Sequence, residues 1–221
     1  MQKTLYPKPN IQALVPVKPF SKGKSRIAPL LDLNHRTILA RHLLLHTLSV
    51  LKDISALGFI SGYNVVSADQ EALRMGRFYG ATSFEESSDG QEIGLNAALE
   101  LAARQIVTTT RCDALLILLA DLPLMNIGVL RDFLFLETTP FVAIAPDRLH
   151  KGTNALLLAP STLLDFSYNF GENSFALHLR KFHSCGLKNI RRCYIPELAY
   201  DLDTPEDFVL LPQKWQSISV L

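Results

Sequence analysis

The fold of this chain is decided by the stretch ALLILLA at residues 114–120, which leads directly into Asp121, Leu122 and Pro123. A run of apolar residues that is closed by an acidic residue and a proline is typical of a strand buried on both faces. Such strands occur in parallel sheets whose two faces are covered by helices. We therefore predict that residues 114–120 form a central parallel strand.

Short apolar runs alternate with amphipathic stretches on both sides of this strand, which predicts an α/β fold with a mostly parallel, mixed sheet and helices on both faces. Extended segments are expected at 11–17, 64–67, 82–84, 141–145, 154–159, 190–195 and 200–203. Helices are expected at 34–51 (capped by Asn34), 70–79 (capped by Asp69), 94–108, 127–137, 174–183 and 205–211 (capped by Thr204). No repeat or linker divides the sequence, so we expect one domain over residues 1–221, with a peripheral tail at 212–221.

Composition and charge exclude several classes of protein. The chain has 221 residues, 48% of them hydrophobic and 19% charged, which is ordinary globular usage. A net charge of +1 gives no general attraction to nucleic acid or to anionic membranes. No apolar run approaches the ~20 residues that span a bilayer, and residues 1–10 lack the apolar run of a secretory signal. We expect a cytoplasmic protein, monomer or homodimer, that binds neither nucleic acid nor membrane, with three free cysteines.

A basic loop at residues 18–26 follows the first expected strand and contains Lys18, Lys22, Lys24 and Arg26. Ligands of open α/β sheets bind beyond the carboxyl ends of the strands, where this loop begins. The loop lacks the G-x-x-x-x-G-K-[ST] spacing of a P-loop. It is either a solvated loop or a phosphate-binding site, and its position favours phosphate binding.

Three carboxylates suggest a metal site. Asp121 follows the central strand, and Mg²⁺ uses one or two protein carboxylates together with phosphate oxygens. Asp201 and Asp203 are two residues apart in an expected extended segment, so they would share one face, and a cation would relieve their repulsion. The alternative is that Asp121 and Asp203 cap the helices that follow them.

An anion site is expected where Gly171 and Ser174 open a helix, because free N–H groups and the helix dipole attract anions there. The alternative, that Ser174 simply caps the helix, is compatible with this role. Thr153 adds a hydroxyl before another expected strand. The six histidines form no recognisable catalytic pattern.

Five strings occur in order along the chain: ALVPVKPFSKGKSRIAP, LLADLPLM, IAPDRLHKGTNALLL, FGENSF and DLDTPEDF. Together, over about residues 11 to 210, they resemble the phosphoenolpyruvate/2-phospho-L-lactate guanylyltransferases of coenzyme F420 biosynthesis. The resemblance implies a nucleotide-diphospho-sugar-transferase-like (Rossmann-like) fold, GTP as donor, Mg²⁺ as cofactor and pyrophosphate as co-product.

The resemblance also implies a role for individual residues. The residues implied in catalysis are Lys24, Arg26 and Asp121, and those implied in nucleotide binding are Lys18, Lys24, Arg26, Gly94 and Asn96. Metal binding is implied for Asp121 with Asp201 or Asp203. Acceptor binding is implied for Thr153, Gly171 and Ser174. The sequence departs from the family pattern at residues 149–151 and 172–173, both near the acceptor. There the basic pair His150 and Lys151 would also suit 3-phosphoglycerate.

We therefore expect GMP transfer from GTP to phosphoenolpyruvate, 2-phospho-L-lactate or 3-phosphoglycerate, with release of pyrophosphate. The acceptor phosphate is already an anion, so it needs no general base to attack the α-phosphorus. The alternatives are a cytidylyl- or molybdopterin-type nucleotidyltransferase of the same fold, or a non-catalytic nucleotide-binding regulator.

Overall fold

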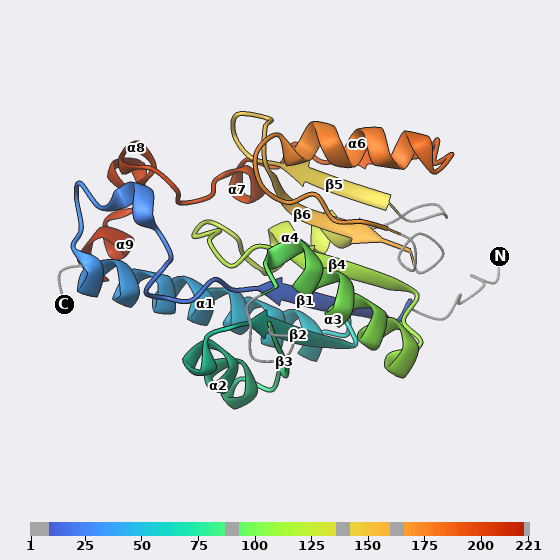
Figure 1. Cartoon of the computed structure of the whole chain (residues 1–221), viewed down its shortest axis with the longest axis horizontal. Coiled ribbons are helices and arrows are strands. Elements are labelled where there is room, and N and C mark those ends of the chain that lie inside the picture. Colours follow the sequence, from blue (N-terminus) through green and yellow to red (C-terminus); the bar gives the residue numbers. More distant parts are fainter. Residues whose placement is uncertain (1–8, 87–92, 136–141, 160–165, 219–221) are drawn as a thin grey trace.

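The computed structural model describes residues 9–86, 93–135, 142–159 and 166–218 (Figure 1). Its strands form one seven-stranded sheet in the order β3-β2-β1-β4-β6-β5-β7, with β4 in the middle. The strands are β1 (Ile11–Pro16), β2 (Gly62–Ser67), β3 (Thr82–Glu85), β4 (Ala114–Leu118), β5 (Val142–Pro146), β6 (Thr153–Leu158) and β7 (Arg191–Arg192).

The sheet is mixed and mostly parallel, as predicted. Strand β6 runs antiparallel to its neighbours β4 and β5, whereas the other four pairs of neighbours are parallel. Every residue of β4 is buried, because helices cover both faces of the sheet. The predicted central strand is therefore confirmed, but it is parallel to β1 alone and antiparallel to β6, and it ends at Leu118 rather than at Ala120.

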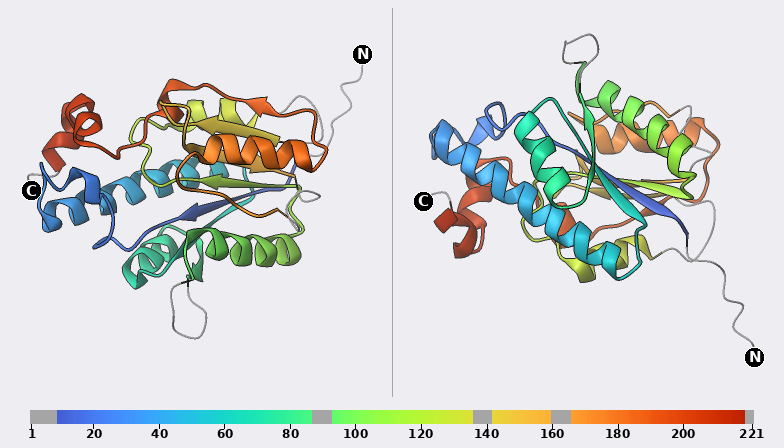
Figure 2. Two further views of the ribbon diagram at one scale, coloured as in Figure 1. Left: turned by 45° about the horizontal axis from the view of Figure 1, so that its top comes forward. Right: turned by 90° about the horizontal axis from the view of Figure 1, so that it is seen from below.

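Helices form a layer on each face of the sheet (Figure 2). Alternate residues of β4 point to opposite faces, with Leu115 and Ile117 in one apolar core and Leu116 and Leu118 in the other. Helices α3 (Leu95–Thr110) and α6 (Ser174–Ser184) cover the first core. The second core is covered by α1 (Leu33–Ala56), α2 (Gln70–Phe78), α4 (Ile127–Leu134) and α7 (Pro196–Ala199).

A third apolar cluster lies at one end of the molecule. It joins the 3-10 helix η1 (Ser25–Ile27) and α1 to α8 (Pro205–Leu210) and α9 (Gln213–Ile218). Its buried residues are Ile27, Leu39, Leu43, Leu202, Leu211 and Trp215. This cluster packs the C-terminal part of the chain against the basic loop. No helix in the described ranges is long and apolar enough to cross a membrane.

The predicted cap of α1 was wrong. Asp32, not Asn34, is the N-cap, and its carboxylate accepts the His35 N–H at 2.9 Å. Helix α1 also continues past residue 51 to Ala56, because Ile54 in this last part is fully buried in the core. The other predicted helices and the strands before residue 160 are present, with ends shifted by a few residues. The predicted helix end at 137 and strand start at 141 lie outside the described residues.

The C-terminal part differs most from expectation. Only Arg191–Arg192 of the extended segment 190–195 pairs as a strand, and residues 200–203 belong to no strand. The tail expected to be peripheral instead forms α9. Its Trp215 is 4% exposed and meets the His46 ring of α1 edge-on at 5.3 Å.

Candidate active site

One edge of the sheet carries the predicted site residues. Strands β1, β4 and β5 end at this edge, and the antiparallel β6 begins there, so that Pro146 pairs with Thr153. The basic loop leaves β1 at the same edge, and Asp121 follows β4. The rule that ligands bind beyond the carboxyl ends of the strands therefore points to one place for the basic loop, Asp121 and Thr153.

Lys24 is the centre of a cluster, here called the Lys24 cluster, which consists of Lys24, Asp121, Leu202 and Asp203. Its ammonium donates to Asp121 Oδ2 at 2.6 Å, to the Leu202 carbonyl at 2.5 Å and to Asp203 Oδ1 at 3.1 Å. The Lys24 side chain is 9% exposed. Burial by itself lowers the pKa of Lys24, but the charges of Asp121 and Asp203 outweigh it and hold the pKa above 10.5. Lys24 is therefore a fixed cation.

The segment 200–203 is held at this cluster by contacts that the sequence did not reveal. The Leu202 N–H donates to the Asp121 carbonyl at 3.0 Å, and the Leu202 side chain is buried in the third apolar cluster. The prediction that Asp201 and Asp203 share the face of a strand was therefore wrong, because this segment is fixed by Leu202 and not by sheet pairing. Both carboxylates nevertheless lie near Asp121, which perturbs the pKa of Asp201.

The carboxylates carry more negative charge than Lys24 neutralises. Burial, followed by the charges of Asp121 and Asp203, raises the pKa of Asp201 to about 7. Burial also acts to raise the pKa of Asp203, but Lys24 and then Arg26 outweigh it and lower this pKa. The second oxygen of Asp121, Oδ1, is buried and lacks a hydrogen-bond partner in the described part of the chain. The unpartnered oxygen of Asp121 lies near Asp201, whose negative charge is disfavoured by burial and by neighbouring carboxylates. A bound cation would stabilise both groups.

A metal ion at this cluster would need ligands from a substrate. Within the described residues, no three His, Cys, Asp or Glu side chains are grouped so that they could hold a metal ion by themselves. Mg²⁺ commonly binds through one or two protein carboxylates and takes its other ligands from phosphate oxygens and water. The donor set of Asp121 with Asp201 or Asp203 matches that mode of binding.

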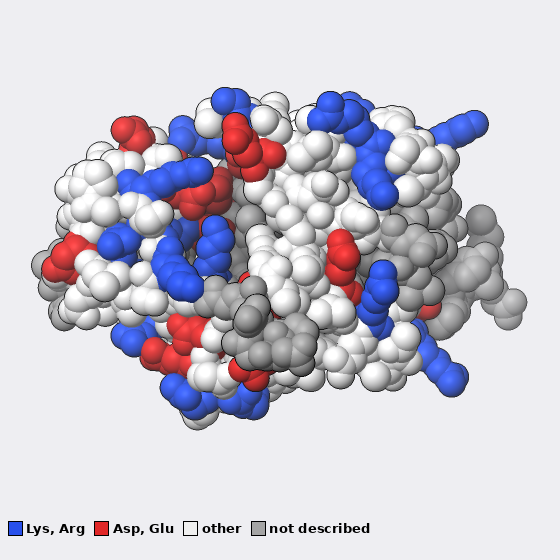
Figure 3. Space-filling view, viewed as in Figure 1, with Lys and Arg blue, Asp and Glu red and all other residues white. Residues whose placement is uncertain are grey.

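The surface beside the cluster is strongly charged. On the face shown in Figure 3, basic and acidic side chains lie side by side over the half of the molecule that carries α1, α8 and α9. Arg26 is an exposed cation beside the Lys24 cluster: its side chain is 74% exposed, and its Nη1 lies 3.6 Å from Asp203 Oδ2. Lys18 is also exposed. Both cations are accessible to an incoming anion.

The second predicted site, here called the Thr153 site, consists of Thr153, Gly171 and Ser174. Thr153 and Ser174 are 2% and 1% exposed. The Phe175 N–H donates to the Lys151 carbonyl at 3.0 Å, which ties the start of α6 to the segment that leads into β6. Thr153 and the N-terminus of α6 are therefore neighbours, as an anion site at this place requires.

The start of α6 has an unusual backbone. Asn173 is the N-cap, has a left-handed φ of 56° and makes no side-chain capping bond. The alternative that Ser174 caps the helix is therefore wrong, because Ser174 is the first residue inside it. Gly171 has a φ of 126°, and a Cβ added there would meet nothing within 4 Å. Glycine is thus required at this position by the backbone conformation and not by a lack of space.

Asn96 contacts the segment before Gly171. Its Nδ2 donates to the Phe170 carbonyl at 3.1 Å, and its Oδ1 accepts the Phe170 N–H at 2.8 Å. The side chain predicted to bind the nucleoside thus holds α3 to residues near the Thr153 site. Gly94, the N-cap of α3, has a φ of 83° and open space around it.

His178 is a further residue of the Thr153 site that the sequence patterns did not predict. This residue is fully buried, and its Nδ1 lies 3.0 Å from Thr153 Oγ1. The Asn169 N–H donates to its Nε2 at 3.1 Å. Its position four residues after Ser174 places it on the same face of α6, and this spacing could have revealed it.

Comparison with known proteins identifies the family of this chain. A family model described as "Guanylyl transferase CofC like" matches residues 11–211. The chain belongs to this CofC-like guanylyl transferase family. It is 36% identical over 203 residues to a phosphoenolpyruvate guanylyltransferase of Rubrobacter xylanophilus, covering 91% of this chain and 93% of the relative. A protein of the same name from Sphaerobacter thermophilus is 35% identical over 195 residues, covering 88% and 89%.

Solved structures support the fold of this CofC-like protein. One described as a nucleotide-diphospho-sugar transferase, from Desulfovibrio desulfuricans, has a TM-score of 0.66 at 15% identity and covers 88% of this chain and 82% of its own. CMP:2-keto-3-deoxy-manno-octonic acid synthetase in complex with CTP has a TM-score of 0.59 at 13% identity, with 96% and 97% covered. The predicted fold class and family are confirmed, and family membership favours a guanylyltransferase over the two alternatives.

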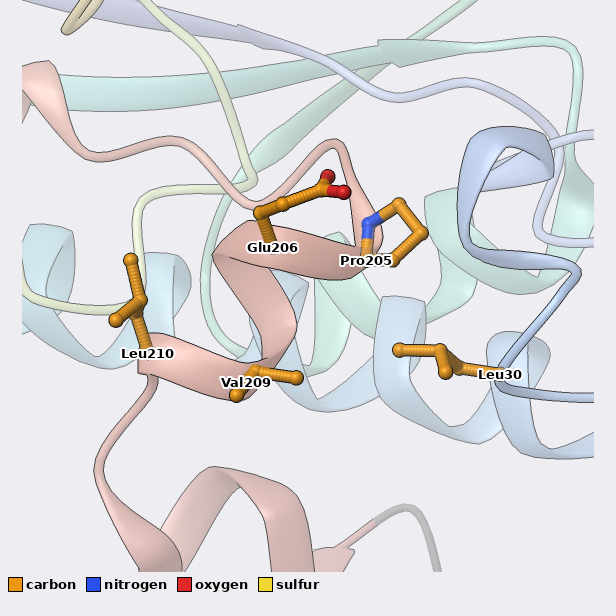
Figure 4. A pocket seen from close by; sticks show the side chains of 5 residues that line it. All are labelled: Leu30, Pro205, Glu206, Val209 and Leu210. Carbon is orange, nitrogen blue, oxygen red and sulfur yellow. The ribbon is translucent and has the colours of Figure 1, made fainter.

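A further pocket of the CofC-like protein does not suit an anionic ligand. It lies beside α8 and is lined by Leu30, Pro205, Glu206, Val209 and Leu210 (Figure 4). Its only charged lining residue is acidic, so it offers no counter-charge to a nucleotide or a phosphorylated acid.

Proposed function

We propose that the protein transfers GMP from GTP to phosphoenolpyruvate and releases pyrophosphate, as a step of coenzyme F420 biosynthesis. The observation that carries this proposal is the placement of two different anion-binding arrangements at one edge of the sheet. The Lys24 cluster offers cations and carboxylates, and the Thr153 site offers hydroxyls and the N-terminus of a helix. Phosphoenolpyruvate is the acceptor that the names of the relatives favour.

The nucleotide side neutralises the charge of the triphosphate. Lys24 is a permanent cation held at the end of β4, and the exposed Lys18 and Arg26 add two more charges within reach of an anion. Charges that are already in place cost little reorganisation during the reaction. When bound through Asp121 and either Asp201 or Asp203, Mg²⁺ would supply further charge neutralisation at the phosphates.

The acceptor side holds the nucleophile. A phosphate placed against the start of α6 meets the Thr153 and Ser174 hydroxyls and the positive end of the helix dipole. One of its oxygens then forms a bond to the α-phosphorus of GTP. The bond from the α-phosphorus to its bridging oxygen breaks, and pyrophosphate leaves with the electron pair. An anionic nucleophile needs no general base, so the protein contributes positioning and electrostatic stabilisation.

A pyrophosphate-release assay tests this proposal. The purified protein is combined with Mg²⁺ or EDTA, each of the four ribonucleoside triphosphates, and phosphoenolpyruvate, 2-phospho-L-lactate or 3-phosphoglycerate. We expect the highest kcat/KM with GTP and phosphoenolpyruvate, and no turnover in EDTA.

Each other result contradicts a specific part of the proposal. A preference for 3-phosphoglycerate or 2-phospho-L-lactate would overturn the acceptor and leave guanylyl transfer in place. A preference for another triphosphate would overturn the donor. Full turnover in EDTA would overturn the metal requirement, and no release with any pair of substrates would overturn the enzymatic function.

A further inference from the structure

The imidazole ring of His178 is held rigidly behind the Thr153 site. It is fully buried, and two aromatic rings enclose it: Phe166 stacks on it at 6.0 Å, and Phe170 meets it edge-on at 4.9 Å. Both ring nitrogens are engaged, Nδ1 with Thr153 Oγ1 and Nε2 with the Asn169 N–H. The ring therefore cannot turn without breaking two hydrogen bonds and the packing around it.

These partners determine which nitrogen of His178 carries the proton. A backbone N–H can only donate, so Nε2 must offer its lone pair to Asn169. Burial lowers the pKa of His178 to about 4, so the ring is neutral near pH 7 and carries a single proton. This proton resides on Nδ1, from which it is donated to Thr153 Oγ1 over 3.0 Å.

The direction of this bond determines what Thr153 can do. Its oxygen accepts from His178, so its hydroxyl hydrogen is directed elsewhere. No acceptor for that hydrogen is found in the described part of the chain. Thr153 is 2% exposed, and a buried hydroxyl is normally satisfied. A deprotonated phosphate or carboxylate oxygen can accept this hydrogen bond, and it carries no hydrogen of its own to donate.

We infer that His178 is a positioning residue that fixes the Thr153 hydroxyl as a hydrogen-bond donor toward the anionic acceptor. The opposite arrangement, with Thr153 donating to His178, would turn a lone pair of the hydroxyl toward the acceptor and repel it. The inference rests on the proposed function, because it assumes that the acceptor binds at Thr153.

Two substitutions separate the two hydrogen bonds of His178. The amide of His178→Asn reaches about as far as Nδ1, so it can donate to Thr153 but cannot reach Asn169. The amide of His178→Gln reaches about as far as Nε2, so it can accept from Asn169 but leaves Thr153 without its donor. Each variant is compared by its KM for phosphoenolpyruvate, its KM for GTP, its kcat and its Tm.

His178→Gln should raise the KM for phosphoenolpyruvate by about tenfold, the equivalent of one hydrogen bond, and change the KM for GTP by less than about twofold. His178→Asn should retain most of the affinity for phosphoenolpyruvate. In a Thr153→Val background, His178→Gln should have no further effect on this KM, because the hydroxyl that it orients is gone. Equal effects of the two His178 variants, or lower Tm values with unchanged KM values, would show a merely structural role and overturn the inference.

Thr153→Val alone separates an error in the acceptor site from an error in the role of His178. If it leaves the KM for phosphoenolpyruvate unchanged, the acceptor site itself is misplaced. If it raises this KM while His178→Gln does not, only the role of His178 is wrong. Nitrogen chemical shifts of His178 in the unmodified protein provide a test that does not depend on the folding of any variant. They should show the proton on Nδ1, and a proton on Nε2 would overturn the inference.

Discussion

Replacing Lys24 with methionine removes the central cation of the Lys24 cluster and keeps a side chain of similar length. Lys24 lies 2.6 Å from Asp121 Oδ2 and 3.1 Å from Asp203 Oδ1. At an effective dielectric constant near 20, these two contacts correspond to about 6 and 5 kcal/mol of Coulomb attraction before desolvation is subtracted. The net loss is smaller, because desolvation offsets much of this attraction.

Removing one partner of a fully buried ion pair costs about 3–5 kcal/mol. Here the side chains of Asp121 and Asp203 are 24% and 42% exposed, so solvent screens part of the charge that remains. We therefore expect Lys24→Met to destabilise the metal-free protein by about 2–3 kcal/mol. For a chain of this size, that lowers Tm by roughly 4–12 °C.

The same substitution should improve the binding of Mg²⁺ in the absence of nucleotide, because Lys24 no longer occupies Asp121 and Asp203. Thermal denaturation in EDTA and across a Mg²⁺ titration measures both effects. Kinetics should show a GTP kcat/KM lower by about 10- to 150-fold, the loss of one charge-assisted contact. Lys52→Met, at an exposed position of α1, is the control and should behave as wild type. The reasoning is refuted if Lys24→Met keeps the wild-type Tm in EDTA, or if Mg²⁺ stabilises it no more than it stabilises wild type.

Three further predictions follow from the two sites. Asp121→Asn should fold normally and lose at least about 100-fold in kcat, a cost of ~3 kcal/mol, in the pyrophosphate assay; near-normal turnover would contradict its role. In EDTA, the contribution of Asp201 to wild-type stability should fall as the pH rises from about 4 to about 7, by at most ~4 kcal/mol. Over that range folded Asp201, with its pKa of about 7, keeps a proton that the unfolded chain has lost. Thermal denaturation at pH 5 and pH 8 should show Asp201→Asn becoming more stable relative to wild type at the higher pH, and the same pH dependence in both proteins would contradict the assignment. Ser174→Ala should raise the KM for phosphoenolpyruvate without the usual loss of a helix cap, and Gly171→Ala should add about 1–3 kcal/mol of backbone strain. Tm and the two KM values separate these effects, and an unchanged KM for phosphoenolpyruvate in Ser174→Ala would move the acceptor site elsewhere.

Local signals in the sequence predicted local structure well. Asp69 caps α2 by accepting the Glu71 and Ala72 N–H groups, and Thr204 forms a reciprocal capping box with Asp207, as expected from their positions before the helices. The same kind of signal failed at α1, where two residues with capping side chains, Asp32 and Asn34, are only two positions apart. The sequence does not decide between them. In the folded chain Asp32 is the cap, because its backbone is extended and its side chain accepts the His35 N–H.

The long-range part of the site could not be read from sequence patterns. Lys24 contacts Asp121, 97 residues away, and Asp203, 179 residues away, and hydrophobic periodicity contains no information about such pairs. The segment 200–203 has the alternation of a strand, but the burial of Leu202 fixes it as a loop. The spacing of four residues from Ser174 could have pointed to His178, but its contact with Thr153, 25 residues earlier on another element, could not be read from the sequence. What the sequence did predict was the edge of the sheet where these residues meet, because the ends of strands can be recognised locally.

The proposed reaction is tested most directly by identifying its product. The protein is incubated with GTP, phosphoenolpyruvate and Mg²⁺, and pyrophosphate and the guanosine-containing product are measured together by mass spectrometry. We expect one pyrophosphate for each product molecule, with a product mass equal to GTP plus phosphoenolpyruvate minus pyrophosphate, and no product when any of the three components is omitted. Pyrophosphate released from GTP alone, or a guanosine product without the atoms of phosphoenolpyruvate, would contradict it.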